Sequence, residues 1–238
     1  MFDVIAFDAD DTLWENESLY AATQARYRQL LAPYLNGEDV AQRLYATEMR
    51  NIPYFGYGIK SFTFSMIEMA VELTDGRVTS ADIRQIIAFA KAMIDAPVRL
   101  LDGVEDVVSR LAASHTLMVI TKGDLLDQER KLERSELSDY FAHVEVVSEK
   151  SEEVYRKLLA RYNVAAERFL MIGNSLRSDV LPVVAIGGRA IHVPHHTTWV
   201  HEVVEHTGDA AYYELEHIGQ LPDLAQRLEQ QAILSHKE

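Results

Sequence analysis

The chain has 238 residues, of which 48% are hydrophobic and 25% charged, as is typical of a folded globular protein large enough to bury a core. Acidic residues outnumber basic residues by 37 to 23, and the net charge of −14 argues against nucleic-acid binding, which usually needs an excess of Lys and Arg. The sequence has no cysteine, which excludes disulfides, thiolate catalysis and thiolate metal sites.

The amino-terminal segment does not resemble a targeting segment. It has no basic stretch, and Asp3 and Asp8 interrupt its apolar run, so a signal peptide is not expected. No window of about 18 residues is apolar throughout, so no membrane span is expected either. We therefore expect a soluble, cytoplasmic protein with no nucleic-acid and no membrane partner. The sequence leaves the oligomeric state open.

Short apolar segments and helical segments alternate along most of the chain. Residues 2–8 form the first predicted strand, and residues 17–95 then carry apolar side chains at spacings of three and four, which is typical of helices. After Pro97 the alternation resumes. Further strands are expected at 115–121, 143–148, 168–173 and 189–193. The pattern predicts an α/β fold with a Rossmann-like parallel sheet and helices on both faces.

The long helical segment does not fit the alternation of strands and helices, so we interpret it as an insertion. The predicted α/β core domain consists of residues 1–15 and 98–238. The predicted cap domain is all-helical and consists of residues 16–97.

Polar side chains stand at the carboxyl ends of the predicted strands, which is the edge of a parallel sheet where ligands bind. The first strand ends in FDADDT, which places Asp8, Asp10 and Asp11 close together. Clustered carboxylates repel one another and resist burial. The acids therefore either solvate a turn or hold a cation and act on an anion.

The acids suit a reaction on phosphorus. One carboxylate of the pair Asp8 and Asp10 could attack phosphorus while the other transfers a proton. Carboxylate and amide oxygens are also the ligands that Mg²⁺ prefers. Asn174 and Asp179, which flank a turn after the fourth strand, could complete or orient such a metal site.

The other strand ends offer groups for a phosphoryl oxygen. Thr121 supplies a hydroxyl, and the backbone N–H groups of Lys122 and Gly123 follow it. Lys150 lies before a helical segment and offers a point charge to the nucleophile and the phosphoryl group.

Four motifs in order resemble the haloacid dehalogenase (HAD) superfamily of hydrolases. Residues 8–12, DADDT, resemble its DxDxT signature, and GNSLRSD at 173–179 resembles its fourth motif. Thr121 and Lys150 stand where the second and third motifs are expected. The helical insertion resembles the C1 cap of this family.

The resemblance implies a Mg²⁺-dependent phosphatase for a small phosphorylated metabolite. Asp8 would be the nucleophile that forms an aspartyl-phosphate. Asp10 would protonate the leaving oxygen and then activate water. Thr121 and Lys150 would fix the phosphoryl group.

The metal site implied by the resemblance departs from the family pattern at one position. Asp8 and the backbone carbonyl of Asp10 would hold Mg²⁺ with help from Asn174 and Asp179. The family usually has an aspartate where this sequence has Asn174, and an amide oxygen contributes no negative charge. Weaker metal binding, and weaker activity, would follow unless Asp179 compensates.

Three alternatives remain at the level of sequence. A dehalogenase of the same superfamily would need no metal, but such enzymes lack the second aspartate of the first motif. A binding protein that kept the fold without turnover is suggested only by Asn174. A receiver-type phosphoacceptor module is shorter and has no cap.

Two segments have no assigned role. Residues 50–60 of the cap carry aromatic side chains, and Lys60 or Arg50 could bind an anionic substrate group; equally, the aromatics could fill the core of the cap. A histidine-rich stretch at 192–206 includes His192, His195, His196, His201 and His206. It lacks carboxylates at a recognised zinc spacing, so a loop after the last core strand is expected rather than a zinc site.

Overall fold

The computed structural model describes residues 1–35, 37, 39–197, 199–202, 204, 207–208 and 210–235. The chain divides into two compact units. The first consists of Met1–Glu17, Val98–Thr121 and Lys131–Glu238, and the second of Ser18–Pro97 and Lys122–Arg130. The second unit thus contains a short segment from the region after the helical insertion.

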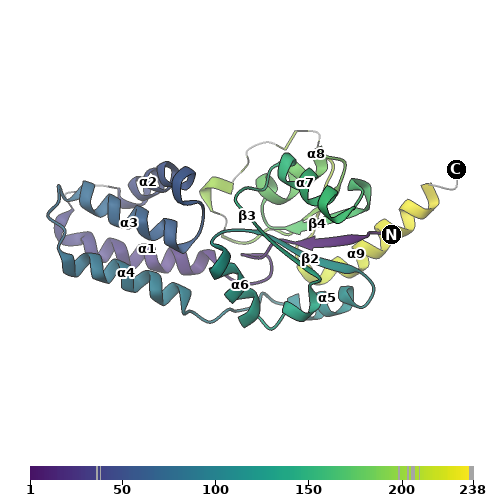
Figure 1. Ribbon diagram of the computed structural model, residues 1–238, viewed down its shortest axis with the longest axis horizontal. Helices are drawn as coiled ribbons and strands as arrows, with labels where there is room; N and C mark the ends of the chain where they lie inside the picture. Colours follow the sequence, from purple (N-terminus) through teal and green to yellow (C-terminus); the bar gives the residue numbers. More distant parts are fainter. Residues whose placement is uncertain are drawn as a thin grey trace. The chain divides into compact units, whose positions relative to one another are not determined.

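A six-stranded sheet with the order β3-β2-β1-β4-β5-β6 crosses the described part of the first unit (Figure 1). β1 pairs in parallel with β2 and β4, and β5 pairs in parallel with β4 and β6. The strands are β1 (Val4–Phe7), β2 (Thr116–Lys122), β3 (His143–Val147), β4 (Phe169–Gly173), β5 (Arg189–His192) and β6 (Tyr213–Glu214). The predicted parallel sheet is confirmed. Its sixth strand was not predicted because two residues are too few to show a periodicity.

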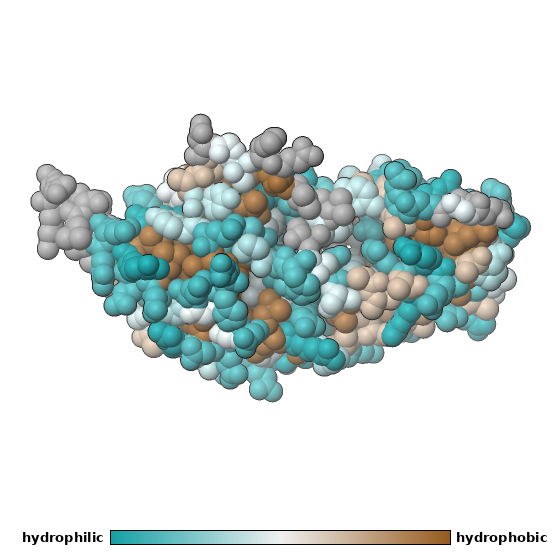
Figure 2. Space-filling view, turned by 180° about the vertical axis from the view of Figure 1, so that it is seen from behind, coloured by the Kyte–Doolittle hydropathy of each residue, from teal (hydrophilic) through white to brown (hydrophobic). Residues whose placement is uncertain are grey.

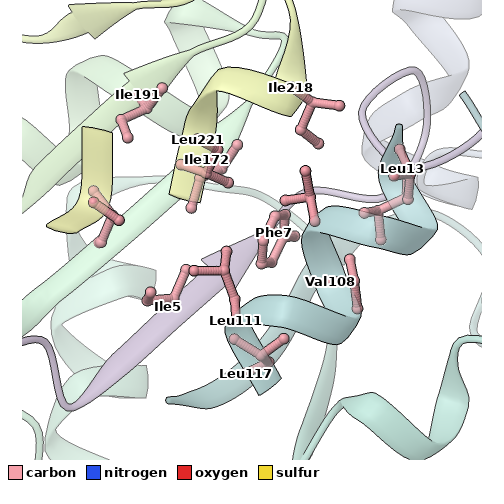
Figure 3. Packing of buried hydrophobic residues seen from close by; sticks show 14 of the residues in the cluster. Ile5, Phe7, Leu13, Val108, Leu111, Leu117, Ile172, Ile191, Ile218 and Leu221 are labelled. Carbon is pink, nitrogen blue, oxygen red and sulfur yellow. The ribbon is translucent and has the colours of Figure 1, made fainter. Parts of the chain in front are cut away.

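Helices cover both faces of this sheet because both faces of its central strands are apolar. Ile5 and Phe7 of β1 lie in a hydrophobic cluster with α5 and α9 (Figure 3), whereas Val4 and Ala6 lie in a second cluster with α7 and α8. The helices of this unit are α5 (Val104–Ala112), α7 (Glu152–Tyr162), α8 (Leu181–Ala185) and α9 (Leu221–Ser235). α6 (Leu125–Arg134) follows β2, and of its residues only Lys131 to Arg134 belong to this unit.

The strand order reverses beside β1. The chain proceeds from β1 to β2 and β3 on one side, and then returns to place β4 on the other side of β1. In open parallel sheets, ligands bind outside the carboxyl ends of the strands at such a reversal. The loops that follow β1 and β4 are therefore the first place to look for a functional site.

The second unit has its own hydrophobic core. Its helices are α1 (Glu17–Leu31), α2 (Val40–Phe55), α3 (Ile59–Leu73) and α4 (Ser80–Ile94). All four helices contribute buried side chains to one cluster, in which the Tyr27 hydroxyl donates a hydrogen bond of 2.7 Å to the Met66 carbonyl. Thr79 and Asp82 form a capping box at the start of α4.

The surface carries both hydrophilic and hydrophobic residues. Figure 2 shows hydrophilic residues over most of one face, with hydrophobic residues in separate patches. Among the described residues, no helix combines the length and the apolar character that crossing a membrane requires.

Candidate active site

A buried ion cluster lies at the carboxyl ends of β1 and β4. Asp8 directly follows β1, and its backbone N–H donates to the Ile172 carbonyl of β4 at 2.8 Å. The Lys150 ammonium donates to Oδ1 of Asp8 and, at 2.6 Å, to Oδ1 of Asp179. The side chains of Lys150 and Asp179 are only 2% and 1% exposed. One cation therefore serves two carboxylates in a site almost without solvent.

The cluster contains two carboxylates and only one ammonium. The attraction to Lys150 therefore does not fully offset the cost of burying both negative charges. Burial raises the pKa of Asp8 to about 7, and the charge of Asp179 acts in the same direction, against the lowering effect of Lys150. Burial lowers the pKa of Lys150, but the attraction of Asp179 and Asp8 is stronger and leaves this pKa above its usual value. Lys150 is therefore held as a cation beside a carboxyl group whose pKa is raised.

Asp179 is fixed by the turn after β4. The turn continues into a single π-helical turn, Leu176–Val180, and Oδ2 of Asp179 accepts a hydrogen bond of 3.0 Å from the Ser175 backbone N–H. A Cβ atom at Gly173 would overlap this carboxylate. A residue with a side chain at position 173 would therefore displace the Asp179 carboxylate.

Thr12 links the loops after β1 and β4. Its hydroxyl accepts from the Asn174 backbone N–H at 3.1 Å, and its Oγ1 lies 3.2 Å from Asn174 Oδ1 and 3.4 Å from Asp8 Oδ2. Thr12 therefore connects the two loops across the reversal point of the sheet and brings Asn174 close to Asp8.

Asp10 lies in a different environment. Its Oδ1 accepts one hydrogen bond from the Trp14 indole N–H and one from the Lys131 ammonium, each at 2.7 Å. The carboxylate is close enough to Asp8 to contribute, as the weakest of the named influences, to raising the pKa of Asp8. Sequence reasoning missed both partners, since Lys131 stands 121 residues away.

Asp11 caps the helix that follows. It adopts a left-handed backbone conformation with φ of 60°, and its carboxylate accepts from the backbone N–H groups of Asn16 and Glu17 at 2.9 and 3.0 Å. Carboxylates at a helix start satisfy N–H groups that have no partner within the helix. Asp11 therefore stabilises the turn that leads into α1.

Ionisation of Glu17 is expected to lower the free energy of unfolding as the pH rises. Burial raises its pKa from 4.5 to about 7, and the charges of Asp11 and Asp10 add to the effect. Because the folded state holds this proton more tightly than the unfolded state, stability is lost as pH rises from about 4.5 to about 7. Glu17→Gln should therefore gain about 2 kcal/mol over the wild type between pH 4 and pH 8 in denaturant titrations. Glu167→Gln, at an exposed glutamate, is the control and should show the same pH dependence of unfolding free energy as the wild type. The same pH dependence in Glu17→Gln would contradict the prediction.

The phosphate-binding groups predicted at the end of β2 are divided between the two units. Thr121 is buried near the end of β2, beside β1. Lys122 and Gly123 belong to the second unit, where the Lys122 ammonium lies 4.5 Å from the centre of the Tyr57 ring. Gly123 has a φ of 136°, and a Cβ there would meet the Gln128 amide at 2.8 Å.

The cap segment 50–60 contacts the same short segment after β2. Lys60 forms an ion pair of 3.0 Å with Asp124, and Arg50 pairs with Glu72 at 3.1 Å. More than half of each cationic side chain is exposed, so these pairs contribute little to stability and do not prevent either residue from meeting an anion. The role of this segment in substrate binding stays a prediction.

The donor atoms near Asp8 fit Mg²⁺ by type. Asp8, Asp179 and Asn174 offer only oxygen donors, and Mg²⁺ typically takes one or two carboxylates and keeps several waters. Among the described residues, no group of three or more His, Cys, Asp and Glu side chains is arranged to hold a metal. An ion at this place would therefore depend on the amide oxygen of Asn174 or on a backbone carbonyl as well as on the two carboxylates.

Two residues from the histidine-rich stretch, His192 and Glu202, contact the turn after β4. His192 Nε2 lies 3.1 Å from the Asn174 carbonyl oxygen, and its Nδ1 lies 2.8 Å from Glu214. Glu202 accepts from the hydroxyls of Ser175 and, at 2.6 Å, Ser178. His206 lies outside the described residues. No sequence signal pointed to Glu202, because it lies in an irregular segment.

Known proteins resemble this chain over most of its length. The family model of the haloacid dehalogenase-like hydrolases matches residues 2–187. A glyceraldehyde 3-phosphate phosphatase of Pyrococcus abyssi is 28% identical over 199 residues, which are 80% of this chain and 81% of that protein.

Solved structures share the fold. A haloacid dehalogenase-like family hydrolase from Xanthomonas campestris is 41% identical, with a TM-score of 0.88 over 98% of this chain and 94% of that one. A 2-haloacid dehalogenase from Pseudomonas syringae pv. Tomato is 23% identical, with a TM-score of 0.66 over 95% of this chain and 99% of that one.

Proposed function

The chain belongs to the haloacid dehalogenase-like hydrolase family, and from this premise we propose that it is a Mg²⁺-dependent phosphatase that hydrolyses a small phosphorylated metabolite through an aspartyl-phosphate on Asp8. The buried cluster of Asp8, Lys150 and Asp179 is the observation that carries the proposal. A carboxylate beside a permanent cation, at the reversal point of a parallel sheet, suits attack on an anionic phosphoryl group.

The first half of the reaction transfers the phosphoryl group to the protein. An oxygen of Asp8 forms a bond to phosphorus while the bond from phosphorus to the leaving oxygen breaks. Asp10 gives its proton to that oxygen, so that an alcohol leaves instead of an alkoxide. Lys150 and Thr121 stabilise the charge on the phosphoryl oxygens.

The second half restores the protein. Asp10, now a carboxylate, takes a proton from water as the water oxygen attacks phosphorus. The bond between phosphorus and Asp8 breaks, which releases inorganic phosphate and returns both aspartates to their starting states. The two aspartates therefore have different roles, and their different surroundings agree with this: Asp8 is paired within the buried cluster, whereas Asp10 is held by Trp14 and Lys131.

Mg²⁺ would be held by Asp8, Asp179, Asn174 and the backbone carbonyl of Asp10. When bound, it supplies positive charge that neutralises the phosphoryl oxygens. The cytoplasmic location expected from the sequence stays a prediction.

The relatives suggest a phosphorylated small molecule as the substrate and do not identify the compound. The name of the Pyrococcus abyssi relative identifies glyceraldehyde 3-phosphate as the substrate of that protein. We include this compound in a panel of small sugar and acid phosphates, without assigning it to this chain.

Hydrolysis of 4-nitrophenyl phosphate by purified protein, with and without Mg²⁺, tests the proposal. Turnover that depends on the metal is expected. Release of halide from a 2-haloacid without any phosphatase activity would instead support the dehalogenase alternative. Binding of a phosphate analogue without turnover of any phosphate ester would support the non-catalytic alternative suggested by Asn174.

Asn174→Asp should tighten Mg²⁺ binding by about tenfold, because it adds a carboxylate beside two others. The measurement is the Mg²⁺ concentration that gives half-maximal activity, together with the Mg²⁺-dependent rise in melting temperature. Asn163→Asp, at the exposed end of α7, makes the same chemical change away from the site and should leave both values unaltered. An unchanged metal requirement in Asn174→Asp would show that residue 174 is not a ligand.

A further inference from the structure

One oxygen of the Asp10 carboxyl group accepts hydrogen bonds from a neutral and a cationic donor. The Trp14 indole and the Lys131 ammonium both donate to Oδ1 at 2.7 Å. The side chains of Lys131 and Asp10 are 15% and 22% exposed, so their hydrogen bond is better shielded from solvent than the ion pairs on the surface. Trp14 itself is 1% exposed and lies in the hydrophobic core beside β1.

We propose that Lys131 and Trp14 are positioning residues that hold the Asp10 carboxyl in the orientation needed for proton transfer to the leaving oxygen. This inference rests on the proposed phosphatase function, in which Asp10 is the general acid. Neither residue belongs to the four motifs recognised in the sequence. Lys131 comes from α6, which follows β2, and Trp14 from the turn after β1.

The two hydrogen bonds fix the orientation of the carboxyl group. Oδ1 accepts from two N–H groups, and neither can accept a hydrogen bond in return. The two donors therefore determine which way Oδ1, and with it the plane of the Asp10 carboxyl group, faces. Rotation of the carboxyl would break two hydrogen bonds at once, one of them to a charged donor, so this arrangement is held firmly.

A purely structural role for Lys131 makes a different prediction. The Lys131 ammonium also donates to Oδ1 of Asn16 at 3.2 Å, so Lys131 has a second link to the loop after β1. Loss of this link alone would weaken the whole loop and slow every substrate alike. Loss of Asp10 positioning should affect poor leaving groups most, because good leaving groups depart without a proton.

The test is a leaving-group series that runs from 2,4-dinitrophenyl phosphate to phenyl phosphate and an alkyl phosphate. In Lys131→Met, kcat/KM for the alkyl phosphate should fall by about 30-fold or more, and for the dinitrophenyl ester by less than about threefold. Lys131→Arg, which keeps the charge, should recover part of the loss. Asn16→Ala removes the other link of Lys131 and should show no dependence on leaving group. Lys157→Met, at an exposed lysine of α7, should match the wild type.

Equal losses for all esters in Lys131→Met, or no loss at all, would overturn the inference. Wild-type protein that hydrolyses no phosphate ester would instead overturn the proposed function. In that case a second readout still decides the positioning role: the ¹H–¹⁵N signal of the Trp14 indole, which reports the hydrogen bond to Asp10. This signal should shift in Lys131→Met but not in Lys157→Met, and an unmoved signal would contradict the inference.

Discussion

Asp8→Asn is expected to abolish phosphate-ester hydrolysis, with a loss of at least about 10⁴-fold in kcat. An amide cannot form the phosphoryl ester, and the other residues of the site cannot replace this step. The fold should survive, because Lys150 keeps its ion pair with Asp179 and the amide fills nearly the same volume. Steady-state kinetics and the melting temperature measure the two effects separately.

Asp10→Asn serves as the comparison. It should lower turnover strongly but spare formation of the phosphoryl enzyme from an ester with a good leaving group. Rates close to those of the wild type in Asp8→Asn would rule out the covalent mechanism. An unfolded Asp8→Asn protein would show instead that Asp8 is needed for the core.

Lys150→Met is expected to have the largest effect on stability. It leaves the buried carboxylates of Asp8 and Asp179 without their cation, a change that typically costs about 3–5 kcal/mol. Because protonation removes the repulsion between these carboxylates, the loss should be smaller at pH 5 than at pH 8. Denaturant titration in the presence of a chelator measures it without compensation by a metal.

Two variants sharpen this prediction. Adding Asp8→Asn to Lys150→Met removes one of the stranded charges and should recover part of the lost stability. Lys157→Met has the same chemical change at an exposed ion pair and should change stability by less than about 1 kcal/mol. A Lys150→Met protein as stable as the wild type at pH 8 would contradict the account of the buried cluster.

The parts of the fold that follow from local periodicity could be predicted from the sequence. The strand from Val4 to Phe7 is apolar on both faces, as a central parallel strand must be, and the polar residues after it lie at the expected edge. The association of Asp8 with Lys150 could be anticipated, because both follow strands of one parallel sheet and strand ends meet at a common edge.

Contacts set by tertiary packing could not be predicted. The pairing of Asp10 with Lys131 joins residues 121 positions apart in the sequence, and no periodicity encodes it. The role of Thr12 between two loops likewise depends on the neighbouring positions of β1 and β4. The ion pair of Lys60 with Asp124 joins residues 64 apart, in segments assigned from the sequence to different domains.

Trapping of the phosphoryl enzyme is the most direct test of covalent catalysis by Asp8. Asp10→Asn protein is mixed with 4-nitrophenyl phosphate and Mg²⁺, quenched in acid within the first turnover, and analysed by peptide mass spectrometry. One added phosphoryl group is expected on the peptide that contains Asp8, and none when Asp8→Asn is also present. Release of nitrophenol with no phosphate on Asp8, or with phosphate on another residue, would contradict it.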